Sequence, residues 1–334
     1  MKDTNDRKLL VSIITPAFNE ESNVLECARR VAEVMATQMP EYEYEHIFSD
    51  NASTDGTLEA LTALANEDHR IKVISLSRNI GPFRNSANAM RSAKGEAVIP
   101  MLAADLQDPP EVIPDLIRGW ENGYYIVYGV RQDRREGFVK RNLRRVYYRT
   151  IALAGGHTAP PAHAGEFQLL DRAVVDSVLS VDDQYPYIRG LVAQTGARST
   201  SVPYTWGKRS SGKSKNSFFD LLDQGINGFV TVARAPARLA LLLGLLASLF
   251  GVAFGLVSLV WLSITRNGTD AGIPTIVVGV FVLGGLQLFF IGLIGEYMMS
   301  VHGQVRKTPA PFEVARLNFS VTQDGAAEAK DVPS

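Results

Sequence analysis

The sequence has little cysteine and almost no net charge. Its single cysteine in 334 residues, Cys27, excludes an intramolecular disulfide and a cysteine-based zinc site. The 34 basic and 35 acidic residues leave a formal net charge of −1, so the chain lacks the basic surplus of a nucleic-acid-binding protein. No apolar run near the N-terminus is long enough for a secretory signal. We therefore expect no disulfide, no nucleic-acid partner and no leader peptide.

Charged residues are also missing from two long stretches, residues 239–265 and 271–295. Each stretch exceeds the roughly 20 apolar residues that a helix needs to cross a bilayer. A short polar turn, residues 266–270, joins them. The sequence therefore predicts a two-helix transmembrane hairpin within residues 238–302, with helices at about 239–265 and 273–299. Two buried helices of a soluble protein are the alternative interpretation.

Basic residues flank the predicted hairpin on both sides. Arg234 and Arg238 precede the first span, and His302, Arg306 and Lys307 follow the second. The turn between the spans carries only one Arg and one Asp. Because basic residues concentrate on the cytoplasmic side of a membrane, both ends of the hairpin are expected there. This predicts a multi-pass protein of the cytoplasmic membrane whose N-terminal domain lies in the cytoplasm.

The N-terminal part alternates short apolar runs with segments of helical spacing. The predicted strands are residues 10–15, 44–49, 71–76 and 97–102, and the predicted helices are residues 20–39, 57–66 and 85–93. This alternation indicates an α/β fold with a mostly parallel sheet. Asp50, Arg78 and Asp105 each follow a predicted strand. We expect them at the carboxyl edge of the sheet, where such folds bind ligands.

The predicted domains follow from these patterns. Residues 1–215 form the α/β domain, and residues 216–237 form an amphipathic helix beside the membrane. The hairpin spans residues 238–302. Residues 303–334 are expected to be a partly disordered cytoplasmic tail, without order from about Asn318.

Three polar clusters follow the predicted strands, with the sequences TPAFNEE (15–21), DNASTDGT (50–57) and ADLQDPP (104–110). Carboxylates can bind ribose hydroxyls and a hard divalent cation, and basic side chains can bind phosphates. Each cluster alone is a weak signal, because acidic residues after strands often cap helices, as we expect for Asp55. Together they predict a nucleotide-sugar site.

These segments resemble the family 2 glycosyltransferases with the GT-A fold. The resemblance is strongest to the polyprenyl-phosphate glycosyltransferases, the group of dolichyl-phosphate mannose synthase and the bacterial undecaprenyl-phosphate glucosyltransferases. It covers about residues 10–305 and includes the segments YGVR, VKRNLRRVYYR, AGEFQLLDR and YIRGL. No Gln-x-x-Arg-Trp motif follows Asp171, unlike in the processive polysaccharide synthases. The resemblance implies transfer of one sugar, with inversion, from a nucleotide-sugar donor to polyprenyl phosphate at the cytoplasmic membrane face.

The resemblance also implies which residues bind the donor. Its nucleotide-sugar-binding set is Pro16, Glu20, Asp50, Asn51, Asp105, Lys213 and Lys215. Lys213 and Lys215 would lie in a basic loop that covers the donor. Asp105 and Gln107 would hold a divalent metal, Mg²⁺ or Mn²⁺, beside the donor diphosphate.

On the acceptor side, the resemblance implies that Arg131 and Arg141 bind the phosphate of the lipid. Glu166 is the nearest candidate for a base, and a purely structural hydrogen-bond acceptor is the alternative. The implied catalytic residues are thus Asp105, Arg131 and Glu166. Relatives are often oligomeric, so a homo-oligomer is suggested by analogy alone.

The sequence departs from the family pattern at two positions. Asn51 replaces a second Asp after Asp50, and Ala103 replaces the first Asp of the Asp-x-Asp metal motif. A cation held by Asp105, Gln107, waters and donor phosphates is one interpretation, and replacement of the metal by Arg and Lys is another. Two further alternatives stay open for the whole chain. They are a different lipid or glycan acceptor, and a catalytically silent membrane scaffold.

Overall fold

The computed structural model describes residues 8–132, 164–181, 183, 186–205, 207, 246, 253, 257, 260, 264, 272–305 and 309–319. The described residues up to 207 and from 309 onwards belong to one compact unit. Helix α10, Gly272–Val305, and the isolated described residues between 246 and 264 belong to a second.

The first unit contains a mixed sheet of eight described strands, ordered β7-β5-β6-β4-β1-β2-β3-β8. The strands are β1 (Leu10–Ala17), β2 (Glu43–Asp50), β3 (Ile71–Leu76), β4 (Ala97–Ile99), β5 (Ile126–Gln132), β6 (Ala164–Asp171), β7 (Ser199–Thr205) and β8 (Glu313–Leu317). All run in one direction except β6 and β8, which are antiparallel to their neighbours. The predicted α/β fold with a mostly parallel sheet is confirmed.

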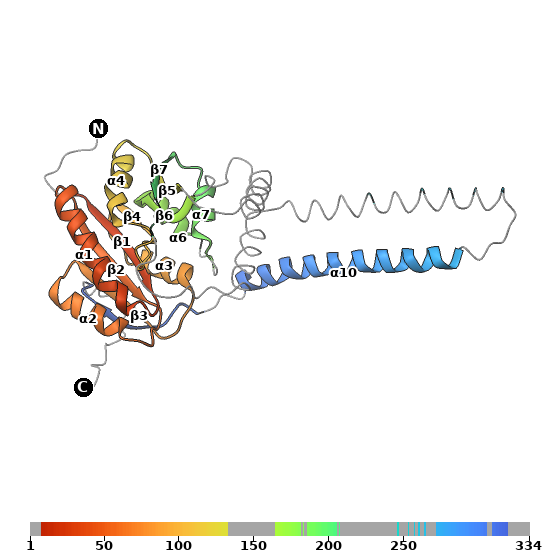
Figure 1. Ribbon diagram of the computed structural model, residues 1–334, viewed down its shortest axis with the longest axis horizontal. Helices are drawn as coiled ribbons and strands as arrows, with labels where there is room; N and C mark the ends of the chain where they lie inside the picture. The colour runs from red at the N-terminus through yellow and green to blue at the C-terminus, as the bar shows by residue number, and fades with distance from the viewer. Residues whose placement is uncertain are drawn as a thin grey trace. The chain divides into compact units, whose positions relative to one another are not determined.

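Helices cover both faces of this sheet (Figure 1). The described helices of the unit are α1 (Glu21–Gln38), α2 (Thr57–Glu67), α3 (Pro82–Met90), α4 (Ile113–Glu121), α6 (Arg172–Leu179) and α7 (Ile188–Gln194), with a 3₁₀ turn, η1, at Pro110–Val112. Helices α1, α2 and α4 share one apolar core with the sheet, and α3, α6 and α7 share the other. Each fully buried large apolar side chain contributes about 1.5–3 kcal/mol relative to exposure.

Helix α1 shows how the sequence specifies this packing. Val24, Ala28, Val31 and Met35 recur on one face of the helix, and all four are buried against the sheet. Cys27 is buried beside them, and burial raises the pKa of its thiol to about 12. The thiol therefore acts as a small apolar side chain in the core.

The strand registers bring several polar segments to one edge. Ala17 pairs with Asp50 at the ends of β1 and β2, and Arg131 pairs with Tyr204 near the ends of β5 and β7. Because β6 is antiparallel, its first residue, Ala164, lies at this same edge opposite Val130. The carboxyl ends of six strands and the start of β6 therefore surround one region.

Strand β4 is shorter than the sequence predicted, ending at Ile99 rather than 102. Pro100 follows Ile99 and has no N–H to continue the ladder, although the N–H of Leu102 still bonds the oxygen of Ile14 at 2.8 Å. The early end of β4 lengthens the loop that carries Asp105.

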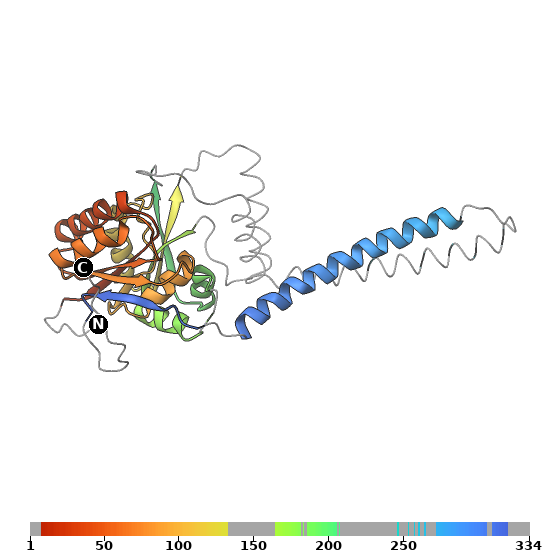
Figure 2. The same ribbon diagram turned by 90° about the horizontal axis from the view of Figure 1, so that it is seen from below.

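Strand β8 is an addition that the sequence analysis did not predict. It comes from the tail beyond the predicted hairpin and pairs antiparallel with β3, with Val73 opposite Leu317 (Figure 2). Asn318 then adopts a left-handed conformation, and its amide donates to the oxygens of Ala65 and Ile71 at 2.6 and 2.8 Å. The tail is thus ordered through this strand, and residues 320–334 lie outside the described residues.

Helix α10 includes all of the predicted second span, residues 273–299, and extends beyond it on both sides. Among the described residues, none of the helices combines the length and apolar character that crossing a bilayer requires. Most of the predicted first span, and all of residues 216–237, lie outside the described residues. The transmembrane hairpin therefore stays a prediction, as do the domain boundaries.

Candidate functional site

The loops after β1 and β2 are joined by side-chain hydrogen bonds. Asn19, in a left-handed conformation, donates its N–H to the Ser53 hydroxyl at 2.9 Å and accepts the N–H of Thr54 at 2.8 Å. Glu20 donates its N–H to the Thr57 hydroxyl at 2.9 Å. The predicted nucleoside-binding segments are therefore joined by hydrogen bonds into one wall at the carboxyl edge, with Pro16 partly buried in β1.

Asp50 ends β2 and is almost fully buried. Its carboxylate accepts the N–H of Ser53 at 3.2 Å and the hydroxyl of Ser75 at 3.3 Å. The structure thus brings Asp50 to the predicted edge and orients its carboxylate against the following turn and β3. Its contact with a nucleoside stays a prediction.

Asn51 uses both ends of its amide. Its oxygen accepts the N–H of Ile80 at 2.9 Å, and its nitrogen donates to the Asn79 side-chain oxygen at 3.0 Å. That Asn79 oxygen also accepts the N–H of Gly81, whose φ of +82° requires glycine-like freedom. A carboxylate at residue 51 has no hydrogen to donate, which gives a physical reason for Asn at this position.

Asp105 lies in the loop after β4 and is 8% exposed. Its carboxylate accepts the N–H of Gln107 at 3.1 Å. Leu106, between them, has a φ of 60° although its side chain is buried in the core. A bulky residue in this conformation is strained and is held there by the surrounding packing, a condition concentrated at functional sites.

This loop offers few ligands for a metal ion. Within the described ranges, no three His, Cys, Asp or Glu side chains lie close enough together to hold one. Asp105 supplies one carboxylate, and Ala103 supplies no oxygen from its side chain. This donor set fits a cation bound mainly by substrate phosphates and water, as Mg²⁺ often is.

Arg131, on β5, belongs to a buried cluster with Asp108 and Tyr204. Its Nη2 donates to both carboxylate oxygens of Asp108, at 3.0 and 3.1 Å, and its Nε donates to the Tyr204 hydroxyl at 3.1 Å. The Tyr204 hydroxyl in turn donates to Asp108 at 2.5 Å. Burial lowers the pKa of Arg131, but the Asp108 carboxylate and the Tyr204 hydroxyl together raise it more, so the guanidinium keeps its charge.

Glu166, near the start of β6, is within the electrostatic influence of two arginines, Arg189 and Arg131. Burial raises the pKa of its carboxyl, against the opposing charges of Arg189 and then Arg131. Arg189, on α7, reaches Glu166 at 3.9 Å and donates to the oxygen of Ala164 at 2.6 Å. Its Nε also donates to the Tyr187 hydroxyl at 2.9 Å. Arg189 therefore ties α7 to the segment that presents Glu166.

The structure thus places most predicted site residues at one edge of the sheet. Those described are Pro16, Glu20, Asp50, Asn51, Asp105, Gln107, Arg131 and Glu166. Lys213, Lys215 and Arg141 lie outside the described residues, so their positions are not compared. Sequence reasoning assigned no role to Asp108, Tyr204 or Arg189. Asp108 and Arg189 stand within the segments ADLQDPP and YIRGL, whereas Tyr204 gave no signal.

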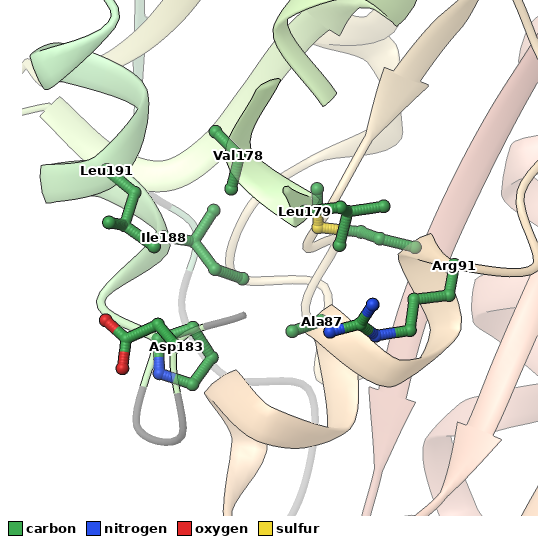
Figure 3. Close-up of a pocket in the computed structure, with 9 residues that line it drawn as sticks. Ala87, Arg91, Val178, Leu179, Asp183, Ile188 and Leu191 are labelled. Carbon is green, nitrogen blue, oxygen red and sulfur yellow. The ribbon is translucent and has the colours of Figure 1, made fainter. Parts of the chain in front are cut away.

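A small cavity lies elsewhere, among α3, α6 and α7 (Figure 3). Its volume is about 20 Å³, room for about one water molecule. Apolar side chains such as Val178 and Ile188 line most of it, with Arg91 and Asp183 beside them. None of the predicted site residues lines it, so it is not part of the edge site.

Several known proteins are similar to this chain over most of its length. The uncharacterized glycosyltransferase YkcC of Bacillus subtilis is 33% identical over 306 residues, covering 91% of this chain and 93% of that protein. The bactoprenol glucosyl transferase of Shigella phage SfII is 30% identical over 302 residues, covering 90% and 96%. Among solved structures, the mannosyltransferase PcManGT from Pyrobaculum calidifontis, in complex with GDP-Man and Mn²⁺, aligns with a TM-score of 0.47 at 17% identity, covering 90% of this chain and 89% of that one.

The model of the family described as glycosyl transferase family 2 matches residues 12–179. That segment contains the joined loops after β1 and β2, the Asp105 loop, Arg131 and Glu166. The two relatives extend the similarity over nine-tenths of the chain. The chain is therefore an enzyme of glycosyltransferase family 2.

Proposed function

We propose that this glycosyltransferase transfers one sugar from a nucleotide-sugar donor to a polyprenyl phosphate. The observation that carries the proposal is the similarity to a bactoprenol glucosyl transferase over 90% of this chain and 96% of that protein. A relative that matched only the catalytic domain would support the donor chemistry alone. Similarity through the hairpin region supports a shared lipid acceptor as well.

On the donor side, we assign the nucleotide to the wall built from the loops after β1 and β2. The diphosphate would then lie beside Asp105 and Gln107. A divalent cation bound there would neutralise charge on the departing nucleoside diphosphate. Asp105 would hold it through the carboxylate, with Gln107, donor phosphates and water completing the shell.

On the acceptor side, the chemistry requires orientation more than proton removal. A phosphate monoester has a second pKa near 6, so at neutral pH it arrives mostly as a dianion. Arg131 carries a fixed positive charge at the carboxyl edge, suited to placing that dianion in line with the anomeric carbon. Direct displacement then inverts the anomeric configuration. Glu166, which interacts electrostatically with Arg189 and Arg131, would offset part of the positive charge around the acceptor phosphate.

We also propose that the chain is held in the cytoplasmic membrane by the predicted hairpin. The two uncharged stretches of the full sequence support this. So do the exposed apolar side chains of α10, which include Ile276, Val280, Leu283, Ile291, Ile294 and Met298. Exposed apolar side chains in this number favour an apolar partner, and lipid is the partner that the proposed acceptor implies.

The test is an assay of purified protein with undecaprenyl phosphate, a panel of radiolabelled nucleotide sugars, and either Mg²⁺, Mn²⁺ or chelator. We expect one donor to label the lipid, and Asp105→Ala to abolish the labelling while the protein stays folded. Label in a different lipid or a glycan would overturn the acceptor assignment. Failure to turn over any nucleotide sugar would favour the silent scaffold.

A further inference from the structure

The strongest unassigned feature is the support built around Arg131. Its guanidinium is held by two residues from different elements, Asp108 in the loop before η1 and Tyr204 on β7. Both are nearly inaccessible to solvent, each at 5% exposure. Asp108 is 96 positions from Tyr204 in the chain, so only the folded sheet brings the three side chains together.

Core packing fixes Tyr204 independently of Arg131. The Tyr204 ring stands edge-on to Phe167, with centroids 5.7 Å apart. Gly129 makes room for it, because a Cβ there would lie 2.9 Å from the ring and 2.7 Å from the Phe167 oxygen. The Tyr204 hydroxyl is therefore a fixed point to which Arg131 is bonded, rather than a mobile group that follows it.

Burying the charged carboxylate of Asp108 costs free energy, because the charge loses its water, and this burial needs an explanation. A buried ion pair gains little stability over apolar side chains of similar volume, because two charges lose their water. An arginine fixed before its ligand arrives, however, loses less side-chain entropy on binding. Its planar guanidinium also presents hydrogen-bond donors in a set direction. The arrangement therefore fits a binding site better than a structural contact.

We propose that Asp108 and Tyr204 are positioning residues that orient Arg131 toward the phosphate of the lipid acceptor. The proposal rests on the polyprenyl-phosphate function above and goes beyond it, since it names two residues that act through a third. It also assigns a task to Tyr204, which carries no recognisable sequence signal. Neither residue needs to contact the substrate.

The first test is Tyr204→Phe, which removes one oxygen and keeps the ring against Phe167. We expect the KM for undecaprenyl phosphate to rise about three- to tenfold, the equivalent of one hydrogen bond. The Kd for the nucleotide sugar should stay unchanged. Tyr44→Phe is the matched control, because Tyr44 is another buried tyrosine, on β2, whose ring lies under Arg70 away from this cluster. It should alter neither constant.

The second test repeats Tyr204→Phe in an Arg131→Lys background, with lipid KM again the readout. If Tyr204 acts through the guanidinium, its loss should have little further effect there. An equal rise of KM in both backgrounds, or an equal loss of donor affinity, would overturn the positioning role. An unchanged KM in Tyr204→Phe, beside an active wild type, would do the same. A wild type that cannot label the lipid would instead refute the proposed function.

Discussion

At the scale of single residues, Asn51 shows how one atom can separate this chain from the common family pattern. Its amide nitrogen lies 3.0 Å from the side-chain oxygen of Asn79, within the loop between β3 and α3. Asp at this position would keep the bond from the Ile80 N–H but set a carboxylate oxygen against the Asn79 oxygen. Asn51 therefore replaces the carboxylate of the family pattern with an amide that bonds the loop after β3.

We predict that Asn51→Asp destabilises the protein by about 1–3 kcal/mol, the cost of a lost and opposed buried hydrogen bond. Thermal unfolding measures the effect. In an Asn79→Ala background the same substitution should cost much less, because the opposing oxygen is gone. If the Asn51→Asp variant is as stable as the wild type, the carboxylate does not oppose Asn79. If Mn²⁺ restores the lost stability of the variant, residue 51 faces a metal rather than Asn79.

Arg189 offers a test of whether Glu166 titrates in the reaction. Its positive charge lowers the pKa of Glu166, against the effect of burial, and Arg131 acts in the same direction while Asp108 opposes it. Removing that charge in Arg189→Met should therefore raise the pKa of Glu166. The acidic limb of the pH profile of kcat/KM should then move to higher pH.

Arg189→Lys is the matched control for this prediction. Lysine keeps the charge but cannot reproduce both bonds to Ala164 and Tyr187, so kcat should fall while the limb stays near its wild-type position. If the acidic limb of the pH profile moves in neither variant, Glu166 does not titrate in the reaction. Its role is then that of a structural hydrogen-bond acceptor, the alternative that the sequence left open.

At the scale of elements, β8 shows what a tail can add to a sheet. Ser77 donates its N–H to the oxygen of Phe312 at 3.0 Å, and Asn88 donates to Glu313 at 2.7 Å. Arg316 donates to Ser92 at 2.6 Å. The strand thus covers the edge of β3 and contacts both ends of the segment from Ser77 to Ser92, which includes the loop bound by Asn51.

We predict that a chain ending at Ala310, which lacks β8, unfolds several degrees below the full chain and aggregates more readily. The reason is that β3 would become an exposed sheet edge. A chain ending at Val321 retains β8 and is the control, with an expected unfolding temperature close to that of the full chain. Equal unfolding temperatures for all three would show that β8 contributes nothing to the stability of the sheet.

The elements also show which parts of the fold are readable in the sequence. Strand β3, residues 71–76, was predicted correctly, and helix α1 was predicted to within one residue at each end. A mostly apolar short run indicates a buried strand, and a helix that covers a sheet repeats its apolar residues every three to four positions. Strand β8 was missed because it is short, lies at an edge and pairs with residues some 240 positions earlier. The Asp108–Tyr204 contact was missed for the same reason, since it joins distant segments and has no local pattern.

At the scale of the whole molecule, β8 constrains the path of the chain across the proposed membrane. Strands β3 and β8 belong to one sheet, so both lie on the same side of any bilayer. If the chain crosses a bilayer between residues 207 and 309, it therefore crosses an even number of times. Two uncharged stretches satisfy this condition, and one alone would not. The condition is independent of the flanking basic residues that predict which side is cytoplasmic.

We predict that a reporter inserted at Gly268 appears outside the cytoplasm and that one joined after Ser334 appears inside. Gly268 lies in the turn between the uncharged stretches, and Ser334 ends the tail that follows β8. Protease protection of spheroplasts and activity of the two reporters measure the outcome. As a control, sugar transfer to undecaprenyl phosphate should persist in the Ser334 fusion, which keeps β8 intact. If both reporters lie inside, the hairpin prediction is wrong. If both lie outside, the catalytic sheet is separated from the cytoplasmic nucleotide sugars that the proposed reaction consumes, and the proposed orientation is wrong.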